Sequence, residues 1–331
     1  MKRLRIAECG LRNGPAAIFI ATLALALLAA PLAADAQQAG RPFKIGALYV
    51  PTAGKALNII GRLGELGYVE GRDYVFEYRY ADSNYDKLPE LAADLVRARV
   101  DVIFASGNTA AQVVLGVTNS IPVVSMSCDA FTLVDSLARH GRNLCGVTCM
   151  RIELTEKRLE IFKQAVPKAT RLAVLYNPIE GPEAMQFAEA AAPRLNLTLL
   201  PVPVRSIKDF EPALEAVRQQ RPDALFVNPD AVIVSRQQQV ADFALKHRLP
   251  AMNPFREFVV AGGLMSYGSS VRDLSRRAAE LIERLLKGAK PSDLPVEQAT
   301  RFYLVLNLKT AKALGVIFPP SIQALADERI E

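Results

Sequence analysis

Short apolar runs alternate with amphipathic stretches along most of this chain. Residues 43–50, "FKIGALYV", form a near-continuous apolar run, which is typical of a strand covered on both faces. Residues 73–81 alternate and are rich in β-branched and aromatic side chains, which predicts a second strand. Residues 86–100 place leucine, alanine and valine on one helical face. Strands and helices alternating at this spacing predict right-handed βαβ units and a parallel sheet.

The same pattern occurs twice. Three segments of the first half match segments of the second half in the same order, at offsets of 122 to 128 residues. The pairs are "KIGALYVP" (44–51) with "RLAVLYNP" (171–178), "DVIFASGNTAA" (101–111) with "DALFVNPDAVI" (223–233), and "IPVVSM" (121–126) with "LPAMNP" (249–254). The repeat predicts an α/β fold of two Rossmann-like, doubly wound parallel-sheet lobes.

The last third of the chain adds further elements without starting another repeat. Residues 262–270 and 301–308 are predicted strands, and residues 273–288 form an amphipathic helix between them, with Gly288 just past its end. We therefore expect this tail to cross back between the lobes and not to form a third domain.

The N-terminus has the pattern of a secretory signal peptide. Basic residues precede the apolar run 16–34, which ends in the small-residue site Ala34-Asp35-Ala36. We expect residues 1–36 to be a signal peptide cleaved after Ala36, with export to the periplasm. The alternative is a membrane anchor, but the continuous apolar core before Pro31 is about 15 residues, whereas a spanning helix needs roughly 20.

Charge and cysteine content narrow the classes of function. The net charge of +6 falls to +4 without the leader, and the basic residues are scattered, which gives no indication of nucleic-acid binding. Cys128, Cys145 and Cys149 remain after cleavage, so one disulfide is possible, although the sequence does not say which pair forms it. With two histidines in the chain, a zinc site has little support, and we expect no metal and no cofactor.

Small polar side chains gather where the predicted strands end. In open parallel sheets, ligands bind beyond the carboxyl ends of the strands. A helix that starts after Asn108 would offer free N–H groups to a carboxylate, Asp129 or Asp230 could pair with an ammonium group, and tyrosines could stack on an apolar group. The candidate ligand-binding residues are Tyr49, Thr52, Ser106, Asn108, Thr109, Ser127, Asp129, Asn177, Asn228, Asp230 and Tyr267.

These residue types also have ordinary structural roles. Ser106 and Asn108 can cap a helix, and Asp230 after a proline can be a turn residue. Asp101 and Asp223 are expected to end loops before strands. No nucleophile-elbow, zinc-protease, phosphate-loop or dinucleotide motif is present, so we expect no catalytic residues and no enzyme activity.

Several segments resemble the periplasmic substrate-binding proteins of ABC transporters, in the branch that includes putative tryptophan and tyrosine transporters. The resemblance covers residues 43–331 and rests mainly on the segments 65–96, 136–148, 157–167, 255–279 and 289–315. It implies a type I periplasmic-binding-protein fold with three hinge crossovers, near 149–151, 268–271 and 298–302. The lobes would then comprise residues 43–149 with 271–298, and residues 150–270 with 299–331.

The resemblance also implies partners and a function. We expect a monomer that closes its two lobes on a small solute, either amino-acid-like or an aromatic or organic carboxylate, and delivers it to an ABC permease and ATPase in the inner membrane. Two other functions stay open on the sequence: a binding protein that serves a membrane receptor or kinase, and an exported enzyme on a Rossmann-like fold.

Overall fold

The computed structural model describes residues 41–331, apart from 52–56, 135, 139–141 and 180–181. The predicted signal peptide and the candidate ligand residue Thr52 lie outside the described residues. Within that part of the chain, no helix is both long enough and apolar enough to cross a membrane.

The first lobe is built on a six-stranded parallel sheet. Its strand order is β11-β5-β4-β3-β1-β2, and every pair of neighbours is parallel. The strands are β1 (Phe43–Tyr49), β2 (Tyr74–Tyr80), β3 (Val102–Ser106), β4 (Val123–Ser127), β5 (Leu144–Thr148) and β11 (Val296–Gln298).

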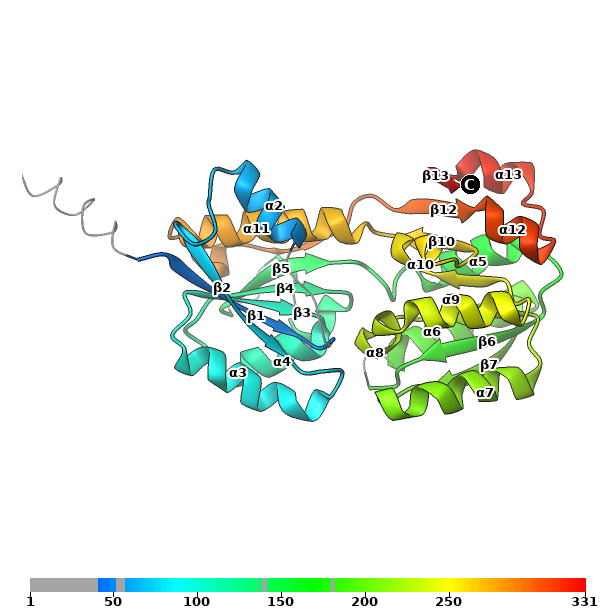
Figure 1. Cartoon of the computed structure of the whole chain (residues 1–331), viewed down its shortest axis with the longest axis horizontal. Helices are drawn as coiled ribbons and strands as arrows, with labels where there is room; N and C mark the ends of the chain where they lie inside the picture. Colours follow the sequence, from blue (N-terminus) through cyan, green and yellow to red (C-terminus); the bar gives the residue numbers. More distant parts are fainter. Residues whose placement is uncertain (1–40, 52–56, 135, 139–141, 180–181) are drawn as a thin grey trace, which may run out of the picture. The chain divides into compact units, whose positions relative to one another are not determined.

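Helices cover both faces of this first sheet (Figure 1). The helix α11 buries leucine, isoleucine and alanine side chains at helical spacing, and the Ser270 hydroxyl caps its start by accepting a hydrogen bond from the Asp273 N–H at 3.1 Å. It packs beside α2 on one face, while α3 and α4 cover the other. The bounds are α2 (Leu57–Glu65), α3 (Leu88–Arg97), α4 (Asn108–Val117) and α11 (Val271–Leu286).

The second lobe contains a seven-stranded sheet in the order β13-β12-β10-β9-β8-β6-β7. Its strands are β6 (Arg171–Tyr176), β7 (Thr198–Pro203), β8 (Ala224–Val227), β9 (Ala251–Asn253), β10 (Met265–Gly268), β12 (Tyr303–Asn307) and β13 (Glu328–Ile330). Its helices are α5 (Thr155–Ala165), α6 (Pro182–Ala191), α7 (Phe210–Gln220), α8 (Ala231–Ser235), α9 (Gln237–Lys246), α10 (Arg256–Val260), α12 (Leu308–Leu314) and α13 (Pro320–Leu325).

The predicted fold class of two parallel-sheet α/β lobes is confirmed. Two strands depart from the parallel pattern: β12 pairs antiparallel with β10, and β13 is parallel to β12, so it also runs against the rest of the sheet. The chain passes from one sheet to the other three times: between β5 and α5, between β10 and α11, and between β11 and β12. β12 enters the second sheet directly from such a crossover, without a helix to reverse its direction, which explains its orientation.

The repeated aspartates at the start of the two matching segments have the same role in both lobes. The Asp101 carboxylate accepts a hydrogen bond from the Lys44 N–H at 2.7 Å, and the Asp101 N–H donates back to the Lys44 carbonyl at 2.8 Å. Asp223 does the same with Arg171, at 2.8 Å for both bonds. Each aspartate therefore fixes the start of the neighbouring strand, β1 or β6, and this confirms the prediction that both residues end loops before strands.

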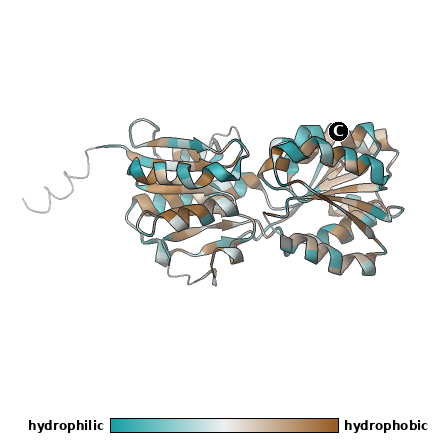
Figure 2. Ribbon diagram, turned by 90° about the horizontal axis from the view of Figure 1, so that it is seen from below, coloured by the Kyte–Doolittle hydropathy of each residue, from teal (hydrophilic) through white to brown (hydrophobic). Residues whose placement is uncertain are grey.

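Apolar side chains fill the layers between sheets and helices in both lobes. Figure 2 shows hydrophobic colour along the strands and on the inward sides of helices, with hydrophilic colour on outward helix surfaces. Because both faces of each sheet are covered, β8 is apolar throughout and β3 is apolar up to its last residue, Ser106, and both strands are almost wholly buried. The polar side chains at the ends of these strands are the exceptions to this pattern.

An ion-pair network joins α2 to α11. Glu65 accepts from Arg276 at 2.7 Å and from Arg62 at 2.9 Å, and these two guanidinium groups lower its pKa from the ordinary 4.5 to about 2. A lowered carboxyl pKa stabilises the folded state above the ordinary pKa, and this contribution is lost as the pH falls through the folded value.

Glu65→Gln should therefore lower the urea midpoint of unfolding modestly at pH 7, and the difference from the parent should shrink between pH 4.5 and pH 2. The matched control is Glu90→Gln, an exposed acid of α3. If the difference in urea midpoint between Glu65→Gln and the parent does not change with pH, the network stabilises the fold through packing and not through charge.

Candidate functional site

The carboxyl ends of the first sheet bring several predicted ligand residues to one edge. In the sheet register, Tyr49 at the end of β1 lies beside Ser106 at the end of β3, and Ser127 at the end of β4 lies beside Thr148. The Ser127 side chain is buried, and its hydroxyl has no hydrogen-bond partner among the described residues. Thr109 follows in the first turn of α4 and is partly exposed.

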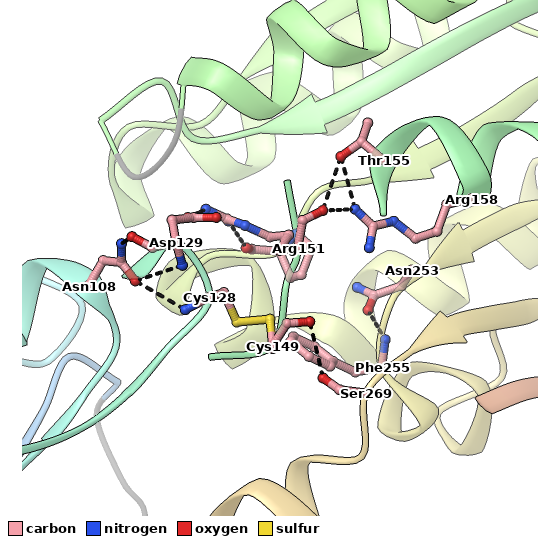
Figure 3. Close-up of a disulfide and its surroundings, with 11 residues drawn as sticks. Asn108, Cys128, Asp129, Cys149, Arg151, Thr155, Arg158, Asn253, Phe255 and Ser269 are labelled. Carbon is pink, nitrogen blue, oxygen red and sulfur yellow. Dashed lines mark hydrogen bonds and ion pairs between the residues drawn. A yellow bond between two sulfur atoms is a disulfide. The ribbon is translucent and has the colours of Figure 1, made fainter. Parts of the chain in front are cut away.

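Asn108 ties two of these strand ends together (Figure 3). Its side-chain amide donates to the Asp129 carbonyl at 2.7 Å and to the Thr132 hydroxyl at 2.8 Å, and its side-chain oxygen accepts from the N–H groups of Cys128 and Asp129. Gly107 before it has a φ of 102°, a left-handed conformation that favours glycine. The side chain thus holds the loop after β4 against the start of α4.

Asp129 forms a buried ion pair with Arg151. One carboxylate oxygen, Oδ2, accepts from Arg151 Nη2, and both side chains are at most 5% exposed. The other oxygen, Oδ1, has no hydrogen-bond partner among the described residues. Burial raises the pKa of Asp129, although the charge of Arg151 opposes that rise. One of the two oxygens of the carboxylate that was predicted to bind a ligand ammonium group is therefore already bound by Arg151.

Arg151 lies in the first crossover and contacts both lobes. Besides Asp129 of the first lobe, it donates through Nη1 to the carbonyl of Pro229, at the end of β8 in the second lobe, at 2.6 Å. Its own carbonyl accepts from the Thr155 hydroxyl at 3.1 Å and from Arg158 Nη2. One crossover residue thus connects the polar strand ends of the two sheets.

A disulfide between Cys128 and Cys149 braces the same crossover (Figure 3). The two cysteines directly follow β4 and β5, which are neighbours in the sheet, and their Cα atoms are 4.5 Å apart. Cys145 is a free, buried thiol, and burial raises its pKa to about 12. The Cys149 carbonyl also accepts from the Ser269 hydroxyl, which belongs to the second crossover, at 3.5 Å.

In the second lobe, Asn177 and Asp230 lie together at the ends of β6 and β8. Asn177 Nδ2 donates to Asp230 Oδ2, and Asp230 Oδ1 accepts from the Ile233 N–H at 2.8 Å, which caps α8. The Tyr85 hydroxyl, from the first lobe, donates to the same Asp230 Oδ2 at 3.0 Å. Burial raises the pKa of Asp230, while these hydrogen bonds oppose that rise. Asp230 therefore acts as a helix cap and as a contact between lobes.

The remaining predicted residues lie at strand ends without such ties to one another. Tyr49 belongs to an aromatic cluster, with ring centroids 5.8 Å from Tyr80 and 6.4 Å from Tyr78. Asn228 is buried directly after β8. Tyr267 lies on β10 with its ring 6.4 Å from that of Phe302. These side chains therefore place polar or aromatic groups at the carboxyl edges of the sheets.

Sequence reasoning did not single out Tyr85, Arg151 or Arg158. For Arg158 a signal was present, because Thr155, Leu159 and Phe162 at helical spacing place position 158 on the buried face of α5. Arginine on such a face is rare unless it is paired. For Tyr85 and Arg151 no local pattern exists, since the hydrogen bonds of their side chains named above reach residues at least 92 and at least 22 positions away.

A separate groove of about 740 Å³ lies beside the crossovers and differs in character. Several of its polar side chains are paired with one another: Arg256 with Glu328 at 2.6 Å, and the Tyr303 hydroxyl with the Asp273 carboxylate at 3.0 Å. Charged groups that already satisfy one another offer less to a ligand than the strand-end cluster does.

The fold agrees with the family to which the chain is matched. The sequence model of the ABC transporter substrate binding protein family matches residues 55–330, so the chain belongs to this family of binding proteins. The expected family resemblance is thereby confirmed.

Individual relatives give more detail. The chain is 26% identical over 262 residues to the tyrosine-binding protein of Clostridioides difficile strain R20291, covering 78% of this chain and 75% of that protein. Among solved structures, a conserved domain protein from Vibrio cholerae superposes with a TM-score of 0.80 at 23% identity, covering 87% of this chain and all of that one. A Streptococcus ABC domain in complex with L-Trp superposes at 0.75 and 24% identity, covering 86% of this chain and all of that one. These structures share the fold.

Proposed function

We propose that this chain is the solute-binding component of an ABC importer and that its solute is an α-amino acid with an aromatic side chain. The observation that carries the proposal is the position of Arg151, which joins the strand-end loop of Asp129 in one lobe to that of Pro229 in the other. A solute held between these two loops would contact both lobes and stabilise the closed arrangement.

The class of solute is supported by two further observations. Tyr49, at the carboxyl end of β1, is stacked with Tyr80, so aromatic rings lie at this end of the strand. The relative named as a tyrosine-binding protein is matched over 262 residues. In this proposal Ser106, Asn108, Thr109, Ser127, Asp129, Asn177, Asn228, Asp230 and Tyr267 form or support the binding site.

The proposal includes a cellular setting. The protein would be exported to the periplasm with residues 1–36 removed, remain a monomer, and hand its solute to a membrane permease driven by an ATPase. Rotation of the lobes about the three crossovers would alternate between solute entry and closure.

A thermal-shift screen of the leaderless chain tests the proposed solute class. L-Tyrosine or L-tryptophan should raise the unfolding temperature by several degrees, because a ligand at 100 times its Kd stabilises the folded state by about 2.7 kcal/mol. The D-enantiomers and myo-inositol serve as matched controls. A shift with sugars and none with amino acids would contradict the proposed solute.

A further inference from the structure

Two buried guanidinium groups and one buried carboxylate lie together at the first crossover, and only one of the guanidinium groups pairs with the carboxylate. Arg151 and Arg158 are 4% and 1% exposed, and Asp129 is 4% exposed. Arg151 uses its charge on Asp129 through the ion pair described above. Arg158, in contrast, donates from Nη2 only to neutral oxygens: the Arg151 carbonyl and, at 3.0 Å, the Thr155 hydroxyl.

The remaining donors of Arg158 are unsatisfied. Neither Nε nor Nη1 has a hydrogen-bond partner among the described residues. Burial, followed by the charge of Arg151, lowers the pKa of Arg158 to about 9, so the group still carries its charge at neutral pH. Buried donors without partners destabilise a fold considerably, and buried charges are normally paired. Among the described residues, no anionic group accepts a hydrogen bond from Arg158.

An unsatisfied acceptor lies in the same cluster. Asp129 Oδ1 has no hydrogen-bond partner in the described part of the chain, and Asp129 and Arg158 are close enough for each to shift the pKa of the other. Glu153 is the other acidic side chain that acts favourably on the charge of Arg158. The cluster therefore lacks both an acceptor for Arg158 and a donor for Asp129. A zwitterion supplies both, because its carboxylate accepts and its ammonium group donates.

We propose that Arg158 binds the carboxylate of the solute and makes the protein select amino acids over the corresponding amines. This inference rests on the proposed function and adds to it the residue that reads the carboxylate. Because Arg158 is enclosed in the described conformation, the carboxylate reaches it when the crossover around Arg151 moves. In the described conformation, Arg158 Nη2 donates a hydrogen bond to the Arg151 carbonyl, which belongs to that crossover (Figure 3). Motion of the hinge therefore also changes access to the Arg158 guanidinium group.

Titration calorimetry of the leaderless chain with L-tyrosine and tyramine, and with L-tryptophan and tryptamine, tests the proposal. The parent should bind each amino acid about 10- to 100-fold more tightly than its amine, the size of effect measured for hydrogen bonds to charged groups. In Arg158→Gln this preference should fall to within about threefold, with the Kd for the amine little changed. Arg158→Lys keeps the positive charge but loses the pair of N–H donors with which a guanidinium group binds a carboxylate. This variant should therefore show an intermediate preference for the amino acid over the amine.

The matched control is Arg194→Gln, because Arg194 is 66% exposed and pairs with Glu156 on the surface. This variant should keep the full preference. A folded Arg158→Gln variant that still prefers the amino acid as strongly as the parent overturns the inference and leaves the proposed function intact. A parent that binds amines as tightly as amino acids also overturns it alone, whereas a parent that binds none of the four compounds overturns both.

A second measurement tests the proposal even if the Arg158 variants do not fold. A crystal structure of the parent with L-tyrosine or L-tryptophan should place a carboxylate oxygen within hydrogen-bond distance of Nε or Nη1 of Arg158. A carboxylate bound elsewhere, with Arg158 still enclosed, rejects the assignment.

Discussion

Arg151→Met should lower the free energy of unfolding by about 3–5 kcal/mol, because it leaves the Asp129 carboxylate buried without its partner. The loss should be larger at pH 7 than near pH 5. Burial already raises the pKa of Asp129, and removal of the opposing guanidinium raises it further. A carboxyl with a raised folded pKa favours the folded state at low pH and opposes it once the pH passes that value. Urea unfolding at both pH values measures the difference.

A double-mutant cycle separates the ion pair from packing. Asp129→Asn combined with Arg151→Met should cost clearly less than the sum of the single changes, because neither buried charge then remains. The exposed pair of Arg194 and Glu156, with a separation of 2.8 Å, is the matched control, and Arg194→Met should change stability by less than about 1 kcal/mol. Additive single changes at Asp129 and Arg151 would contradict a direct pairing.

Removal of the disulfide should destabilise the protein by about 3 kcal/mol, since Cys128 and Cys149 close a loop with a sequence separation of 21 residues. For a chain of this size the unfolding temperature should fall by about 5 °C. The double variant Cys128→Ala/Cys149→Ala and the parent treated with a phosphine reductant should show the same loss. Thermal unfolding followed by circular dichroism measures it.

Cys145 provides the control for this experiment. The Cys145→Ala variant should remain sensitive to the reductant, whereas the double variant should not respond to it. The denatured leaderless parent should expose one thiol per chain, that of Cys145. Three free thiols before reduction, or a parent whose unfolding temperature ignores the reductant, would mean that the bond does not form.

The fold could be predicted because its information is local and periodic. Apolar strand-length runs between amphipathic helices specify βαβ units, and the near-constant offset between matching segments specifies two lobes. The antiparallel β12 was not predicted, because strand direction depends on the path of the preceding crossover and not on the residues of the strand. The cysteine pairing was undetermined for a similar reason: three cysteines allow three pairs, and only the adjacency of β4 and β5 selects one.

For the candidate residues, the sequence predicted the position at the strand ends better than it predicted what each side chain binds. Asn108, Asp129 and Asp230 do lie at the strand ends, but the structure uses all three to hold loops, a crossover arginine or a helix start. The ties of Asn108 and Asp129 span 21 and 22 residues, so no local pattern reveals them, whereas the helix cap by Asp230 is local. Arg151 and Arg158 were overlooked because an isolated arginine in a sequence is usually a surface residue. Their importance follows from burial, which only the folded chain shows.

Hydrogen–deuterium exchange of the leaderless chain, with and without L-tyrosine, reports directly where the solute lies. If the solute is held between the two sets of strand ends, exchange should slow together in residues 106–109 and 127–132 of the first lobe and in residues 228–230 and 253–255 of the second. Protection confined to one lobe, or found instead in the groove lined by Arg256, Ser266 and Tyr303, would contradict binding between the lobes.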